Sequence, residues 1–250
     1  MRYVARLGLS SKVSSALARK QEKVNAKSSA GKLSAIAEWK QARKTKPVQE
    51  ALLLLRRMMN PFERCMYCHH SHATDIDHFW PKTPYPGRML DWCNFLLCCT
   101  ECGRFKGDSF PFEKGLPAII DPTAEDPWLH LDFIPETGNL TARFDPSQNA
   151  FSKKGEATVA ALRLGERETL AREYVRSFGR LKRIVLQFLE TQNSDVNQLI
   201  QDLRQHDDHG LLGWCFGDRG ERVSPFADLK AQRLDAWERC LVEDKIGWFT

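Results

Sequence analysis

Apolar residues recur at helical spacing in the first and last parts of the chain but not in its middle. Residues 11–44 are rich in Ala, Lys, Gln and Glu, which favour helices. We expect Ser28, Ser29 and Gly31 to divide this stretch into two helices. Pro47 suits the first turn of a further helix that ends before Pro61. Its expected apolar stripe is Val48, Leu52, Leu55 and Met59.

Helical spacing returns after Gly155. Ser194 is the expected N-cap of a short helix carrying Leu199, Ile200 and Leu203. Ser224-Pro225 is expected to open a final helix. The longest stripe in this region consists of Leu170, Tyr174, Phe178, Leu181 and Val185. The expected buried positions of the final helix are Leu229, Trp237 and Leu241. We interpret most of these residues as packing.

Between Pro61 and Phe151 the chain is dense in Pro, Gly, Cys, His and aromatic residues, so short strands and turns are expected. Ile76, Phe79 and Trp80 fit a buried strand edge that Pro81 ends. A Gly138-Asn139 turn indicates a hairpin. The pattern predicts an α+β, mostly helical fold in three segments: a basic helical arm (1–60), a central segment (61–150) and a C-terminal helical region (151–250).

Composition narrows the classes of protein. The chain has 250 residues, 42% of them hydrophobic and 28% charged, so it can bury a core and is not disordered as a whole. Its apolar runs are far shorter than the roughly 18 residues of a membrane span. The Arg- and Ser-rich start has no secretory apolar region, although an organelle transit peptide would have a similar composition. We expect a soluble, cytoplasmic protein without a membrane partner.

Positive charge is concentrated near the N-terminus. Residues 1–57 hold fourteen Lys and Arg but only three Asp and Glu, whereas the rest of the chain is mildly acidic. A basic arm of this kind is typical of polyanion binding, although a solvated helix face would have the same composition.

Eight cysteines include two CxxC pairs, Cys65/Cys68 and Cys99/Cys102, with thirty residues between them. Four thiolates on two tight turns suit tetrahedral structural zinc. The alternatives are buried thiols or disulfides, and a cytosolic setting disfavours disulfides. Cys98 could exchange with Cys99 as a ligand. The remaining cysteines are expected to be small buried hydrophobes: Cys93, Cys215 and Cys240.

Between the CxxC pairs lies the dipeptide Asp77-His78, and Asn94 follows before an apolar triplet. Together with both CxxC pairs and Lys106, these residues resemble the zinc-braced HNH endonuclease family over residues 62–110. The resemblance implies two strands and a helix that hold one divalent metal, Mg²⁺ or Mn²⁺, with DNA as substrate. We interpret the neighbouring histidines mainly as turn residues that face solvent or nucleic acid: His69, His70 and His72.

The resemblance implies a role for each matched position. Asp77 resembles the metal-ligating carboxylate, and oxygen ligands suit Mg²⁺ or Mn²⁺. His78 resembles the general base that takes a proton from the attacking water, and its ordinary pKa of about 6.5 leaves it mostly neutral at pH 7. Asn94 resembles the family's middle residue, whose amide holds the histidine loop or the imidazole itself in orientation.

One signature position departs from the family: Gly103 stands where a His or Asn should complete the metal site. Another side chain could replace it, or Asp77, water and DNA phosphate could hold the metal, or catalysis could be lost. The candidate replacements are Asp108, Glu101, Asp75 and His70. Candidate phosphate contacts are Lys82, Arg104 and Lys106, for which ordinary solvated charge is the alternative.

Residues 110–145 extend a looser resemblance to HNH subunits of bacterial anti-phage systems of the Septu type, including retron-associated ones. That resemblance implies an ABC/SMC-like ATPase partner. The function predicted is a metal-dependent DNA endonuclease, the regulated subunit of a defence complex. The alternative is a zinc-ribbon module that binds nucleic acid or a partner without catalysis. A stand-alone restriction or homing nuclease ranks last, because no sequence-reading helix motif is present.

Overall fold

The computed structural model describes residues 1–59, 62–191 and 194–246. Contacts group the chain into two compact units, which are described separately. The N-terminal unit comprises Arg6–Tyr67 and Ser71–Ile119. The C-terminal unit comprises the chain from Ile120 onward together with two earlier segments, Met1–Ala5 and Cys68–His70. The three segments expected from the sequence stay a prediction.

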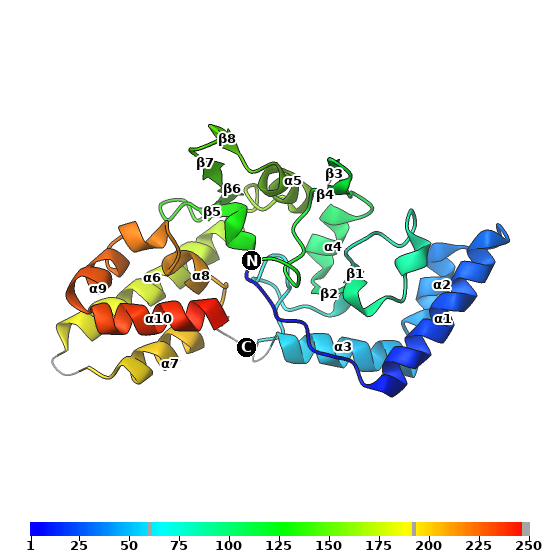
Figure 1. The fold of residues 1–250 in the computed structure, drawn as a ribbon, viewed down its shortest axis with the longest axis horizontal. Helices are drawn as coiled ribbons and strands as arrows, with labels where there is room; N and C mark the ends of the chain where they lie inside the picture. The colour runs from blue at the N-terminus through cyan, green and yellow to red at the C-terminus, as the bar shows by residue number, and fades with distance from the viewer. Residues whose placement is uncertain (60–61, 192–193, 247–250) are drawn as a thin grey trace. The chain divides into compact units, whose positions relative to one another are not determined.

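Three helices open the N-terminal unit (Figure 1). Ser10 caps the first helix by accepting from the Val13 amide, and Gly31 with a φ of 66° lies in the turn after it. The predicted division of residues 11–44 is therefore confirmed. The helices are α1 (Ser11–Ser29), α2 (Ala35–Ala42) and α3 (Lys46–Met58).

Helix α3 begins with Pro47 in its first turn, as predicted. Val48 and Leu55 are buried, but Leu52 is only half-buried because the inward stripe runs through Ala51 instead. The helix ends at Met58, and Pro61, the residue expected to lie just beyond it, falls outside the described residues.

Two strands and a helix follow in the same unit. Strand β1 (Asp75–His78) pairs antiparallel with β2 (Phe95–Cys98), so that Asp77 faces Leu96 and His78 faces Phe95. Every residue of β2 is buried, which fixes the hairpin in the core. The short helix α4 (Thr100–Lys106) follows β2 directly. The remaining elements are η1 (Pro86–Arg88), η2 (Trp92–Asn94), β3 (Phe112–Glu113) and β4 (Leu116–Pro117).

The C-terminal unit combines short hairpins with helices. Its hairpin of β5 and β6 turns at Gly138, as predicted; the φ there is 78°, and a Cβ atom would lie 2.0 Å from the Ala171 carbonyl oxygen. Only glycine fits this turn. Its elements are η3 (Pro127–Leu129), β5 (Leu131–Phe133), β6 (Leu140–Ala142), β7 (Phe144–Asp145), β8 (Ala150–Phe151), α5 (Lys153–Leu162), α6 (Glu168–Glu190), α7 (Val196–His206), α8 (Leu212–Cys215), η4 (Gly220–Arg222), α9 (Phe226–Gln232) and α10 (Leu234–Ile246).

Helix α6 buries the whole predicted stripe from Leu170 to Val185. Two other expectations need correction. Asp195, not Ser194, caps α7: its carboxylate accepts from the Asn197 amide, whereas the Ser194 hydroxyl donates to the Phe188 carbonyl. The region after Ser224-Pro225 forms two helices, α9 and α10, rather than one.

The described part of the chain is an α+β structure, mostly helical with four two-stranded sheets. Leu229 and Trp237 are buried as expected, whereas Leu241 is half-buried. Among the helices described, none combines the length and the apolar character needed to cross a membrane.

Candidate functional site: the Asp77-His78 hairpin and its cysteine cluster

The two CxxC pairs meet in one buried cluster. The Sγ atoms of Cys65, Cys68, Cys99 and Cys102 all lie within 4.8 Å of one another. Tetrahedral zinc with Zn–S bonds of about 2.3 Å places its sulfurs about 3.8 Å apart, so this donor set fits a structural zinc ion. The predicted cluster is confirmed as a metal-binding arrangement, and it joins the start of α4 to the turn before β1.

The other cysteines lie outside this cluster. Cys98 is buried, and its thiol donates to the Cys99 carbonyl oxygen at 3.2 Å. Cys215 and Cys240 are buried as expected. Cys93, however, is exposed, because it lies in the 3₁₀ turn η2 before the strand rather than in the strand itself. None of the eight cysteines, all of which lie in the described part of the chain, forms a disulfide.

The three histidines after the first CxxC pair differ in exposure. His72 is exposed and His70 is half-buried, but His69 is 4% exposed. The expectation that His69 faces solvent or nucleic acid is wrong, because its backbone turns with a φ of 50° and the ring enters the interior. Burial lowers the pKa of His69 well below its usual value, so the ring is neutral.

Asp77 accepts two close contacts at one carboxylate oxygen. The Tyr67 hydroxyl donates to Oδ2 at 2.8 Å, and the Lys106 ammonium lies 3.0 Å from the same atom. The Asp77 side chain is 15% exposed, so this pair is largely shielded from water. Sequence reasoning missed Tyr67, whose position between two metal-binding cysteines gives no signal for a carboxylate partner.

Lys106 does not lie where the sequence predicted. Its side chain is fully buried, and the ammonium also donates to the His78 carbonyl oxygen at 2.7 Å. The predicted phosphate contact by Lys106 does not fit this placement. Lys106 lies one helical turn after Gly103, on the same side of α4. A positive charge therefore lies beside Asp77.

His78 is held as a neutral base by its surroundings. Its ring is 2% exposed and lies edge-on to Trp39 of α2 at 4.3 Å between centroids. Because the Met89 carbonyl oxygen, 2.9 Å from Nε2, can only accept, Nε2 carries the proton and Nδ1 carries the lone pair. Burial lowers the pKa of His78 to about 4, against the opposing charge of Asp77. In the described part of the chain Nδ1 makes no hydrogen bond.

Asn94 ties the strand ends together. Its Oδ1 accepts from the Trp80 amide at 2.6 Å, and its Nδ2 donates to the carbonyl oxygens of Trp80 and Arg88 at 3.0 and 2.9 Å. The Asn94 carbonyl also accepts from the Phe79 amide at 2.9 Å. Asn94 therefore positions the residues that follow His78, and in the described part of the chain it makes no hydrogen bond to the imidazole.

The candidates to replace the residue missing at Gly103 do not gather at Asp77. Asp75 pairs with Arg43 at 2.9 Å, and Asp108 is exposed. His70 stacks on His209, with ring centroids 5.7 Å apart. Within the described residues, the four cysteines are the only group of three or more potential metal ligands brought together. The chain's own side chains at Asp77 do not fit a divalent metal held by protein alone.

The other predicted nucleic-acid contacts are more accessible. Arg104 on α4 is exposed, and Lys82 is half-buried after Pro81. The positive charge of Lys82 acts on His78 and lowers its pKa, so Lys82 lies within electrostatic range of the imidazole. These two residues stay predicted phosphate contacts.

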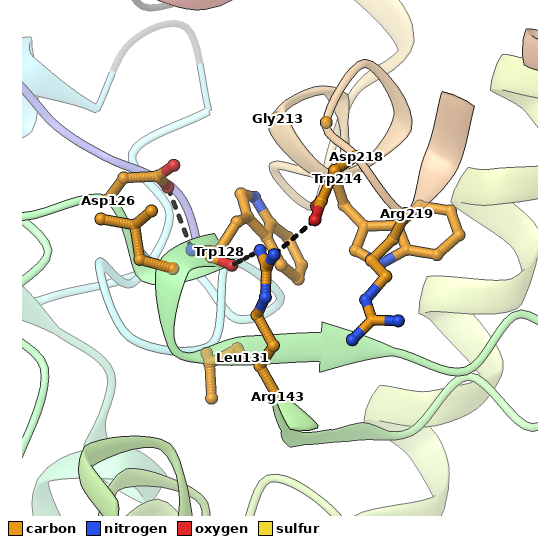
Figure 2. Close-up of a pocket in the computed structure, with 10 residues that line it drawn as sticks. Asp126, Trp128, Leu131, Arg143, Gly213, Trp214, Asp218 and Arg219 are labelled. Atoms are coloured by element: carbon orange, nitrogen blue, oxygen red, sulfur yellow. Dashed lines mark hydrogen bonds and ion pairs between the residues drawn. The ribbon is translucent and has the colours of Figure 1, made fainter. Parts of the chain in front are cut away.

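A separate pocket of about 270 Å³ lies in the C-terminal unit (Figure 2). Trp128, Leu131 and Trp214 supply its apolar lining. Arg143 donates to the Trp128 carbonyl and pairs with Asp218, as Figure 2 shows. The Arg143 guanidinium is therefore already engaged by the protein. No residue of the predicted sites lines this pocket.

Comparison with known proteins finds one partial similarity. A stretch of 123 residues, 47% of this chain, is 28% identical to the Septu protein PtuB of Bacillus thuringiensis. The matched stretch spans 42% of that protein, less than half its length. No family model matches the chain, and no solved structure matches it. The chain is thus distantly similar to a Septu protein and carries a cysteine cluster suited to a metal.

Proposed function

We propose that this chain is the nuclease subunit of a Septu-type anti-phage defence complex and hydrolyses phosphodiester bonds of DNA at the Asp77-His78 hairpin. The observation that carries the proposal is the state of His78. Its Nε2 proton is anchored on the Met89 carbonyl, and the lone pair of Nδ1 makes no hydrogen bond among the described residues. A neutral imidazole fixed on a braced strand has the properties of a general base.

In the reaction, Nδ1 of His78 takes a proton from water, and the water oxygen forms a bond to phosphorus. The bond from phosphorus to the 3′ oxygen breaks, and that oxygen keeps the electron pair and takes a proton from solvent. Asn94 keeps the chain after His78 in place through both backbone groups of Trp80. Lys106 supplies a fixed positive charge beside Asp77.

The structural zinc ion and the catalytic divalent ion of the proposal are supported by different observations. The four cysteines would hold structural zinc, which braces the hairpin against α4. A catalytic Mg²⁺ or Mn²⁺, which the HNH resemblance implies, has one candidate carboxylate here, Asp77, and Lys106 already pairs with it. Metal dependence is therefore part of the proposal that the cleavage assay tests.

The partner in the proposal is an ABC/SMC-like ATPase that licenses cleavage. The ATPase is what the resemblance to Septu-type HNH subunits implies, and the similarity to a Septu protein over nearly half of the chain supports a defence complex with partners. The location in the proposal is the cytoplasm of a bacterium.

The test is nicking of supercoiled plasmid by the chain purified together with the product of the neighbouring gene, which the proposal expects to be the ATPase. Reactions contain Mg²⁺, Mn²⁺ or EDTA, with and without ATP. We expect nicking with a divalent ion, and its loss in His78→Gln, at least about 100-fold, since general bases contribute roughly 10²–10⁴-fold. The Gln amide can still donate to the Met89 carbonyl but offers no basic nitrogen.

The matched control is His206→Gln, because His206 is exposed on α7. It should nick at the wild-type rate. Full activity in His78→Gln, with thermal unfolding unchanged, would remove His78 as the base.

A second candidate function is a zinc-braced binding module without catalysis. The burial of His78 and the ammonium beside Asp77 favour it, since both limit access to the hairpin. DNA binding that survives while no complex, metal or nucleotide produces nicking would select this function.

A further inference from the structure

A cluster of four aromatic side chains lies next to the Asp77-His78 hairpin in the N-terminal unit. It consists of Trp80, Tyr85, Phe110 and Phe112, hereafter the aromatic cluster. The Trp80 ring centroid lies 5.1 Å from that of Tyr85, 4.6 Å from Phe110 and 5.6 Å from Phe112. Such rings usually form a closed core, but here Phe112 is 45% exposed and the other three are half-buried.

The aromatic cluster is coupled to the proposed active site by the backbone. Trp80 is two residues from His78, and the Asn94 side chain bonds both its amide and its carbonyl. The same amide group of Asn94 bonds the carbonyl of Arg88, whose guanidinium lies 4.6 Å from the Trp80 ring centroid. These bonds hold Trp80, and with it the aromatic cluster, in place two residues from the proposed base His78.

Unpaired positive charges accompany these rings. Lys82, Arg88 and Lys114 make no ion pair with any described acidic residue, although many other cations of the chain do. Arg88 and Lys114 are exposed, and Lys82 is half-buried. An apolar protein segment would leave these three cations uncompensated, whereas a nucleic-acid strand offers phosphates to them and base faces to the rings.

We infer that the aromatic cluster binds unpaired bases of a single-stranded DNA segment beside the bond to be cut. Exposed rings cannot stack on bases that are already paired and stacked inside a duplex, so the substrate they select is an unpaired strand. The inference rests on the proposed nuclease function, because it places the bases beside the bond to be cut. Base binding itself can be measured without cleavage.

The test uses the full chain carrying His78→Gln, so that bound DNA is not cut. Fluorescence anisotropy gives its Kd for a labelled oligonucleotide of about 12 thymidines, a length within the usual site size, and for a duplex of equal length. We expect tighter binding of the single strand. Phe112→Ala should weaken single-strand binding about tenfold, because stacking on one ring is worth about 1–3 kcal/mol. Duplex binding should change by less than about twofold.

The matched control is Phe151→Ala. Phe151 is 50% exposed on a two-residue strand of the C-terminal unit, so it resembles Phe112 in type, exposure and local structure. Its replacement should leave both affinities unchanged. A second measurement is photocrosslinking of the oligonucleotide with 5-iodouracil in place of thymine. Adducts should map to the peptides that carry the aromatic cluster.

The outcomes separate this inference from the proposed function. Unchanged single-strand affinity in Phe112→Ala together with crosslinks elsewhere overturns the inference, and plasmid nicking that requires His78 would still support the nuclease. Stacking without any nicking supports the aromatic cluster as a binding surface and contradicts the nuclease. Loss of ATPase recovery in Phe112→Ala, with DNA affinity intact, identifies the cluster as a protein contact and also overturns the inference.

Discussion

Lys106 shows at the scale of one residue how burial changes the role of a charge. Its ammonium has two oxygen partners, Asp77 Oδ2 and the His78 carbonyl, and no exposed side-chain surface. Lysine is rarely buried unless it is paired. The predicted role as a phosphate contact assumed the usual exposed lysine, and nothing in the sequence around α4 indicates that this one points inward.

Replacing Lys106 by methionine tests this ion pair. Met fills a similar volume but leaves the Asp77 carboxylate and the His78 carbonyl without their cation. We expect the free energy of unfolding to fall by about 3 kcal/mol, because removing one partner of a buried pair leaves an uncompensated charge. Urea unfolding followed by circular dichroism measures it. Lys23→Met, at an exposed position of α1, is the control, and an equal small effect in both variants would contradict the argument.

Glu125 provides a second residue-scale prediction, in the C-terminal unit. Burial acts to raise its pKa, but hydrogen bonds from His130 and Lys154 outweigh it and lower the pKa to about 2. Because the folded-state pKa is below the ordinary 4.5, Glu125 stabilises the fold above about pH 4.5, and this contribution is lost as the pH falls toward 2.

We therefore expect Glu125→Gln to lower the free energy of unfolding at pH 7 by about 1 kcal/mol, since the network is partly exposed. The difference from wild type should shrink between pH 4.5 and 3 in denaturant titrations. Glu156→Gln is the matched control, because Glu156 pairs with Lys153 at the surface. A difference that stays constant with pH would show that ionisation of Glu125 does not matter.

At the scale of elements, β1, β2 and α4 lie next to the four-cysteine cluster in the chain, with Cys65 and Cys68 before β1 and Cys99 and Cys102 at the start of α4. The strands are four residues long and α4 has seven residues, so the element cluster is small. Metal binding at such a small cluster of elements is coupled to their folding. Zinc at the four cysteines should therefore be required for the hairpin to hold Asp77 and His78 together.

Chelation tests this dependence. Purified protein should contain one zinc ion per chain, measured by atomic absorption. Its removal with a strong chelator should lower the melting temperature by more than 10 °C, a shift that corresponds to at least about 2 kcal/mol for a protein of this size. Cys99→Ser should reduce zinc content, whereas Cys215→Ser, at a buried cysteine outside the cluster, should not. Full stability without zinc would contradict a bracing role.

The same elements show what the sequence could predict. Local signals were sufficient for the α1–α2 break, the stripe of α6, the Gly138 turn and the pairing of CxxC motifs, because each depends on residues close together or on strict spacing. Lys106, His69 and Cys93 were placed wrongly because their exposure depends on contacts between distant segments. The contact from Tyr67 to Asp77 joins a CxxC turn to a strand, and no short motif encodes it.

At the scale of the whole molecule, the excess of positive charge near the N-terminus includes an exposed stripe of three cations on α1. Lys12, Arg19 and Lys23 are seven and four residues apart, so they share one side of α1, away from buried Val13 and Leu17. None of the three has an ion pair among the described residues. Other cations of the arm are engaged, as in the Arg43–Asp75 pair.

This stripe predicts the salt dependence of DNA binding. The logarithm of the affinity for duplex DNA should fall with the logarithm of salt concentration, by about 0.9 for each neutralised phosphate. Replacing all three cations by Gln should reduce the slope by up to about 2.7. Fluorescence anisotropy titrations from 50 to 300 mM salt measure the slopes of the wild type and of the triple variant. Counterion release dominates the salt dependence over this range. A flat response in the wild type would mean that the arm contacts protein.

The exposure of Cys93 has a practical consequence. It is the one exposed thiol of the eight, all of which lie in the described part of the chain, and it directly precedes Asn94. A maleimide dye should therefore attach at a single position while the other sulfurs are shielded. Fluorescence from that label would report movement of the neighbouring hairpin, and more than one dye per chain would show that loss of the metal had uncovered the cluster thiols.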